Sequence, residues 1–90
     1  MRPYDIAIRI LLALKRKELV DIQKDEFVGV AIEVSEVIDA GQELDPEIMA
    51  RDVIECLMIC DGVDELYGPD EEIIPAILGV LIRSGIQVVH

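Results

Sequence analysis

The sequence predicts an all-α fold, a compact bundle of four main helices joined by short loops within a single domain of residues 1–90. Ninety residues are enough for one hydrophobic core but too few for two. Hydrophobic residues make up 52% of the chain and aromatic residues only 3%, so the core is aliphatic. Four segments carry apolar residues at helical spacing, which favours a bundle.

Residues 4–17 are expected to form the first helix, with Pro3 near its start, where a missing N–H costs little. Apolar side chains cover most of this helix outside a narrow polar stripe, so it needs contacts on more than one side. Residues 18–22 lie in a connector and are a candidate for a minimal two-stranded pairing with residues 86–89.

The second helix is expected from about Glu26 to Ala40, with Gly41 as a left-handed stop. Residues 61–72 hold six carboxylates and are expected to form an acidic loop with at most one short turn. The fourth helix follows, beginning near residue 70 or 74 and ending near Ser84. From residue 73 to residue 82 it is apolar on every face.

The third helix has the clearest start in the chain. Asp45 is a capping residue and Pro46 is suited to the first helical position. Leu44 and Met49 have the spacing of a hydrophobic staple across the cap. The apolar pattern continues to Cys60, so the helix is expected to span about four turns.

The charge is large and unevenly distributed. The formal net charge is −11, which makes direct contact with the phosphates of a nucleic acid unfavourable. Residues 1–24, a basic N-terminal helical segment, hold six basic and three acidic side chains. The acidic helical body of residues 25–90 holds two basic and 16 acidic ones. A basic end on an acidic body can bind within its own chain, to a second copy, or to a basic surface of another protein, so a basic protein partner is one of three alternatives.

On the helical wheel the first and fourth helices carry more apolar surface than a 90-residue chain is expected to bury, which predicts a homodimer. The longest apolar run has ten residues, about half a membrane span, and the N-terminus lacks the pattern of a signal peptide. No membrane association is expected, and a cytoplasmic location is the default expectation.

The inventory of reactive side chains argues against an enzyme. The chain has no Thr, and its only serines and histidine are Ser35, Ser84 and the terminal His90. A nucleophile needs a base and an orienting group, and a histidine at a fraying terminus is a poor base. We therefore expect no catalytic residues and no cofactor.

Cys56 and Cys60 lie one helical turn apart, but two thiols and a distant histidine fall short of the four ligands of tetrahedral zinc. We expect them to pack as small hydrophobic side chains and to bind no metal. One alternative stays open, in which a dimer pools two cysteine pairs into a four-thiolate site. A calcium loop beginning at Asp61 fails, because Leu66 stands where the bend requires glycine.

The segment Asp61-Gly62-Val63-Asp64-Glu65-Leu66-Tyr67-Gly68-Pro69 resembles the third-helix segment of the nuclease-colicin immunity proteins. Those are small acidic four-helix proteins that inhibit a basic nuclease. The resemblance implies contacts through Asp61, Asp64 and Tyr67, with Tyr67 as the anchor. The chain departs from the family at Gly68, where the family has a second tyrosine, and in the basic segment before Glu26.

The function expected from these observations is that of a non-catalytic, protein-binding module with an accessory, regulatory or inhibitory role. An acidic patch would steer a basic partner and a tyrosine would supply buried area. Two alternatives stay open: an immunity-like or nucleic-acid-mimicking inhibitor, and a structural subunit of a larger assembly. The expected contact residues are Glu33, Glu36, Asp61, Asp64, Glu65 and Tyr67.

Overall fold

Four α-helices and a two-stranded antiparallel sheet make up the computed structural model, which describes residues 2–41 and 45–85. The helices are α1 (Pro3–Arg16), α2 (Phe27–Ala40), α3 (Pro46–Ile59) and α4 (Asp70–Arg83), and the strands are β1 (Val20–Ile22) and β2 (Val63–Leu66). A 3-10 turn, Lys24–Glu26, precedes α2. The four predicted helices and a mostly helical fold are therefore confirmed, and a two-stranded antiparallel pair accompanies the helices.

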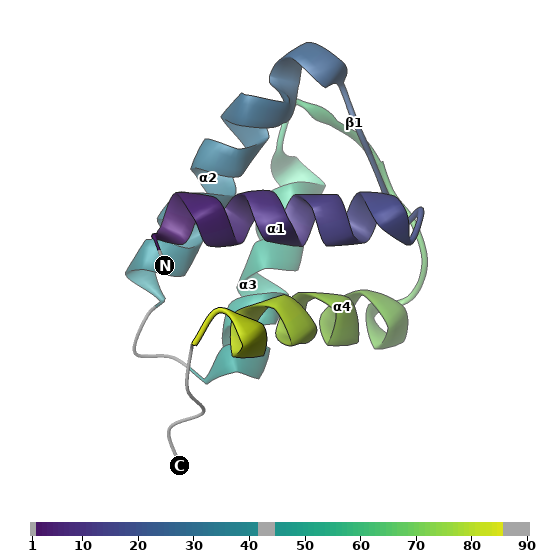
Figure 1. The fold of residues 1–90 in the computed structure, drawn as a ribbon. Coiled ribbons are helices and arrows are strands. Elements are labelled where there is room, and N and C mark those ends of the chain that lie inside the picture. Colours follow the sequence, from purple (N-terminus) through teal and green to yellow (C-terminus); the bar gives the residue numbers. More distant parts are fainter. Residues whose placement is uncertain (1, 42–44, 86–90) are drawn as a thin grey trace.

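The helices contact one another in a closed ring, α1 with α2, α2 with α3, α3 with α4 and α4 with α1. Figure 1 shows α1 and α4 running side by side in opposite directions, with α2 and α3 crossing them. Because α2 and α3 contact each other directly, their solvent-facing sides adjoin on one face of the molecule.

The helix ends follow local sequence signals in most places. The Asp45 side chain accepts a hydrogen bond from the Glu47 N–H at 2.8 Å, so the predicted cap is confirmed. The staple partner Leu44 lies outside the described residues. Gly41 ends α2 but has a φ of −98°, so the predicted left-handed stop is wrong there. Gly85, after α4, does adopt a left-handed φ of 86°.

The strand pair replaces part of the predicted acidic loop. Val20 pairs with Leu66, and Ile22 pairs with Val63. Val63 and Leu66 are partly buried against the core while Asp64 and Glu65 face solvent, so two apolar residues suffice to hold the segment as a strand. Residues 18–22 thus contain the expected strand, but it pairs with residues 63–66. The proposed partner, residues 86–89, lies outside the described part of the chain.

The first helix, expected over residues 4–17, spans Pro3–Arg16 in the structure. Glu18 then takes a left-handed φ of 57° and the chain extends into β1. The segment resembling the third helix of the immunity proteins contains β2 and no helix among its residues 61–69. The resemblance therefore does not extend to the structure.

The core is aliphatic, as predicted. Within the described residues no polar or charged side chain is buried, and no aromatic side chain is fully buried. α1 buries Ile6, Ala7, Ile10, Leu11 and Leu14, and α4 buries Ile73, Ile74, Ile77, Val80 and Leu81. No described helix combines the length and the apolar character that crossing a membrane requires.

Candidate functional site

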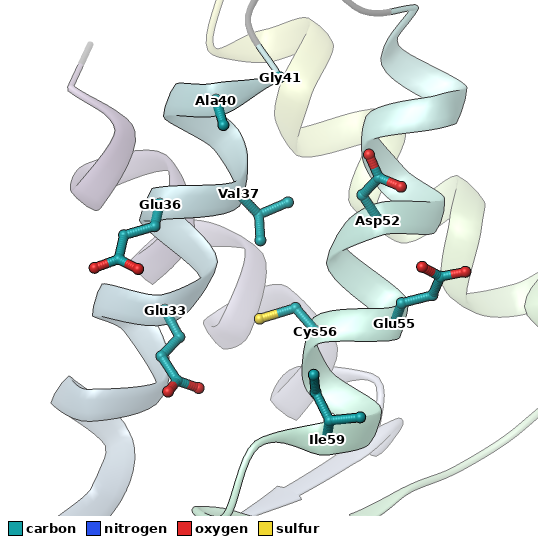
Figure 2. A pocket seen from close by; sticks show the side chains of 9 residues that line it. All are labelled: Glu33, Glu36, Val37, Ala40, Gly41, Asp52, Glu55, Cys56 and Ile59. Carbon is teal, nitrogen blue, oxygen red and sulfur yellow. The ribbon is translucent and has the colours of Figure 1, made fainter.

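An open groove of about 620 Å³ lies between α2 and α3 (Figure 2). Each helix contributes one stripe of side chains at the spacing i, i+3, i+4 and i+7, the spacing of one helix face. The lining residues are Glu33, Glu36, Val37, Ala40 and Gly41 from α2 and its end, and Asp52, Glu55, Cys56 and Ile59 from α3.

The groove is acidic on both sides. Glu33 and Glu36 stand on α2, Asp52 and Glu55 stand on α3, and none of the described basic residues lines the groove. Figure 2 shows the Glu36 and Glu55 side chains on the outer rims, directed away from each other. The nearby Arg51 turns to Glu47, one helical turn earlier, with its Nη2 3.4 Å from the carboxylate Oε1. The groove is therefore a region of negative potential that favours cations.

The floor of the groove is apolar, and the Val37 and Cys56 side chains point into the space between the helices (Figure 2). Ile59, at the C-terminal end of α3, also lines the groove and is 83% exposed. An isolated exposed hydrophobic residue is ordinary, but this one adjoins an apolar floor. The groove therefore combines a charged rim with an apolar interior.

A thiol–carboxylate cluster lies at one end of this groove. The Cys60 thiol donates a hydrogen bond to Glu33 Oε2 at 2.7 Å, and the Cys56 and Cys60 sulfur atoms are 3.8 Å apart. Burial, the hydrogen bond to Glu33 and the nearby charge raise the Cys60 pKa far above its usual range, and burial also raises the Cys56 pKa. Both thiols are therefore protonated at neutral pH when nothing else binds them.

The expected contact residues fall in two places. Glu33 and Glu36 line the groove, whereas Asp64 and Glu65 lie on β2, with Tyr67 directly after it. Asp61 is exposed between α3 and β2. The expected residues thus do not form one continuous contact surface around the groove.

Tyr67 is held by its neighbours on the strand pair. Its hydroxyl donates to Asp21 Oδ2 at 2.6 Å, and beside it the Gln23 amide donates to Asp64 Oδ1 at 2.9 Å. The hydrogen bond to Asp21 raises the Tyr67 pKa. The polar end of this tyrosine is therefore occupied within the chain, which makes it a less adaptable anchor than the sequence suggested.

Sequence reasoning missed the α3 side of the groove, Asp52, Glu55 and Ile59, as a contact surface. The signal was present, because residues 52, 55, 56 and 59 have the same spacing as residues 33, 36, 37 and 40. Comparison of the chain with protein-family models, with curated proteins and with solved structures gives no significant match.

Proposed function

We propose that the protein is a non-catalytic binding module that holds a basic, amphipathic helical segment of a partner protein in the α2–α3 groove. The observation that carries this proposal is the pairing of four carboxylates with an apolar floor in one groove. The proposal keeps the basic partner expected from the sequence and moves the contact surface to Glu33, Glu36, Asp52 and Glu55.

The form of the groove supports a helical occupant. Its two walls are helix faces, and each stripe of lining residues spans seven positions, or about 10 Å of helix. Two turns of a bound helix cover the same length and would place apolar side chains on Val37 and Ile59. Helices bind in grooves by this kind of apolar contact in many protein complexes.

The charge of the rim supports a cationic occupant. Lysine and arginine side chains flanking the apolar face of the bound helix would lie near Glu36 and Glu55. Exposed ion pairs of this kind contribute about 0.2–1 kcal/mol each and accelerate association. The complex should therefore weaken as the salt concentration rises, in contrast to an assembly joined only through apolar faces.

The structure bears on the two alternative functions through particular residues. An immunity-like inhibitor would use Tyr67 on a helix, whereas Tyr67 follows β2 and is bonded to Asp21. A structural subunit would need a broad apolar face. The exposed large hydrophobic residues are instead spread over all four helices, among them Leu12, Ile32 and Ile82. The groove is the better supported contact surface.

The homodimer expected from the first and fourth helices stays a prediction. Within the described residues α1 leaves Tyr4 and Leu12 exposed and α4 leaves Ile82 exposed. Both helices turn most of their apolar side chains into the core of one chain, so less apolar surface is left for a dimer than the helical wheels indicated.

The test uses a fluorescein-labelled synthetic amphipathic helix of lysine and leucine as the probe, with anisotropy as the readout. Replacing Glu36 and Glu55 together by glutamine should weaken binding about tenfold at low salt. A matched variant with Glu65→Gln and Glu71→Gln removes the same charge outside the groove and should bind as the original chain does. Equal losses in both variants, or no loss in the groove variant, would refute the proposal.

A further inference from the structure

We propose that Glu33, Cys56 and Cys60 form a zinc-binding site at the end of the α2–α3 groove, with a fourth coordination position open to the groove. This site is independent of the binding of a basic segment. It uses the two cysteines that were expected to pack as small hydrophobic side chains, together with a carboxylate from another helix that the spacing of the cysteines does not reveal.

The three ligand atoms are already close together. One sulfur atom of each cysteine and one carboxylate oxygen of Glu33 all lie within 4.8 Å of one another. Cys56 and Cys60 come from the last turn and the end of α3, while Glu33 projects from the middle of α2. Two helices that pack directly against each other therefore fix the cluster.

The distance between the sulfur atoms fits tetrahedral zinc. Two sulfurs bound at about 2.3 Å with a tetrahedral angle between them lie about 3.8 Å apart. The Cys56 and Cys60 sulfur atoms are 3.8 Å apart without any rearrangement. A pair of cysteines on one helix turn reaches this spacing only when both side chains turn to the same side, as they do here.

Glu33 would need a small movement. Its Oε2 lies 2.7 Å from the Cys60 sulfur in a hydrogen bond. A sulfur and an oxygen on one tetrahedral zinc lie about 3.5 Å apart. The ion would take the place of the thiol proton between them, and the carboxylate would move outward by about 0.8 Å. Glu33 is exposed, so its side chain can make this adjustment without disturbing the core.

The ligand set selects a borderline-soft ion. Two thiolates with one carboxylate suit zinc, whereas calcium and magnesium require oxygen ligands throughout. The acidic groove, including Glu36, Asp52 and Glu55, adds a general attraction for divalent cations. Three protein ligands leave the fourth position for a water molecule, and the two thiol protons are released to solvent on binding.

The site differs from the four-thiolate alternative in its stoichiometry. A site built by one chain binds one ion per chain and depends on Glu33. A site shared by two copies binds one ion per two chains and needs only the cysteines. The number of ions bound per chain therefore distinguishes the two kinds of site, whatever protein the groove binds.

The experiment is a titration of the reduced, untagged full chain with Co²⁺, followed by displacement with Zn²⁺. We expect a sulfur-to-cobalt charge-transfer band and the visible bands of tetrahedral cobalt, saturating at one ion per chain and abolished by zinc. Cys56→Ser should remove the thiolate band or halve its intensity, and Glu33→Gln should weaken affinity at least tenfold. Glu71→Gln, which changes an exposed carboxylate on α4 outside the groove, should change affinity less than threefold.

Glu33→Gln is the decisive variant, because Glu33 is exposed and its substitution leaves the core unchanged; circular dichroism verifies the fold of each variant. Absence of a thiolate band in the reduced chain overturns the proposal. Saturation at one ion per two chains, or an affinity unaffected by Glu33→Gln, also overturns it. Failure of the labelled helix to bind does not affect the outcome, since the two experiments share no ligand.

Discussion

Replacing Gly62 with alanine tests the contact that holds the start of β2 against the start of α2. A Cβ at this position would lie 2.6 Å from Glu26 Cβ and 2.8 Å from Val30 Cγ2. Carbon atoms in contact normally lie about 3.5–4.0 Å apart, so the new methyl group would be about 1 Å too close. Glu26 Cβ is attached directly to the backbone and cannot rotate away, so the two segments must separate.

The magnitude follows from two opposing effects. Overpacking of this kind costs about 1–3 kcal/mol. The loss of backbone freedom in the unfolded chain recovers about 0.4–1 kcal/mol, since Gly62 does not have the positive φ that would strain an alanine. We expect a net loss of about 1–2 kcal/mol in the free energy of unfolding, or about 5–15 °C in the melting temperature.

The measurement is urea unfolding followed by circular dichroism, with a matched glycine as the control. At Gly79 in α4, a Cβ would meet only the Arg83 Nη2 at 3.7 Å, an ordinary contact. Gly79→Ala should therefore stabilise the protein by about 0.5–1 kcal/mol. In a Glu26→Gly background the cost of Gly62→Ala should shrink, because the closest atom is gone. An unchanged midpoint for Gly62→Ala, or an equal cost in that background, would show that the contact does not limit packing.

Four further predictions follow from particular contacts. Asp45→Ala removes the cap of α3 and should lower the free energy of unfolding by about 1 kcal/mol, measured by urea unfolding. An unchanged unfolding midpoint would show that the cap does not stabilise the helix. Ile77→Ala should cost about 2–5 kcal/mol in the same assay because the side chain is fully buried, and a cost below 1 kcal/mol would contradict the packing. Tyr67→Phe should lower stability at neutral pH. Because the hydrogen bond to Asp21 raises the folded-state pKa of Tyr67, its contribution is complete below the ordinary tyrosine pKa of about 10 and is lost as the pH rises through the raised value. Unfolding midpoints of the two proteins should converge in that range, and a constant difference would exclude the linkage. Light scattering at two concentrations, in low and high salt, should show a dimer that persists at high salt; a monomer throughout would refute the homodimer.

Local signals in the sequence predicted most of the helices. Asp45 and Pro46 defined the start of α3 to the residue, because a cap acts on the N–H groups beside it. The start of the fourth helix was predicted only to lie near residue 70 or 74. α4 begins at Asp70 and contains the proline, with Asp70, Glu71 and Glu72 in its first turn near the positive end of the helix dipole.

Local sequence patterns could not predict the strand pair or the groove, because both join residues that are far apart in the sequence. Val20 and Leu66 are partners across 46 positions, and nothing near Val63 indicates a strand except two apolar residues in an acidic stretch. The spacing of each groove stripe indicates one helix face, but nothing in the sequence indicates that the two faces adjoin. The contact between Cys60 and Glu33 was likewise not predictable from local patterns, because only the packing of α2 on α3 brings the two side chains together.

The two-stranded sheet has a consequence for the behaviour of the protein at high concentration. In the described part of the chain each strand pairs only with the other, so each presents a second edge of backbone N–H and C=O groups. Such edges are templates on which a strand from another molecule can add. Asp21, Asp64 and Glu65 place negative charge along both strands, and a second copy approaching edge to edge would bring the same charges with it. We therefore expect repulsion between these carboxylates to oppose edge-to-edge strand addition between copies of the chain, whatever the groove binds.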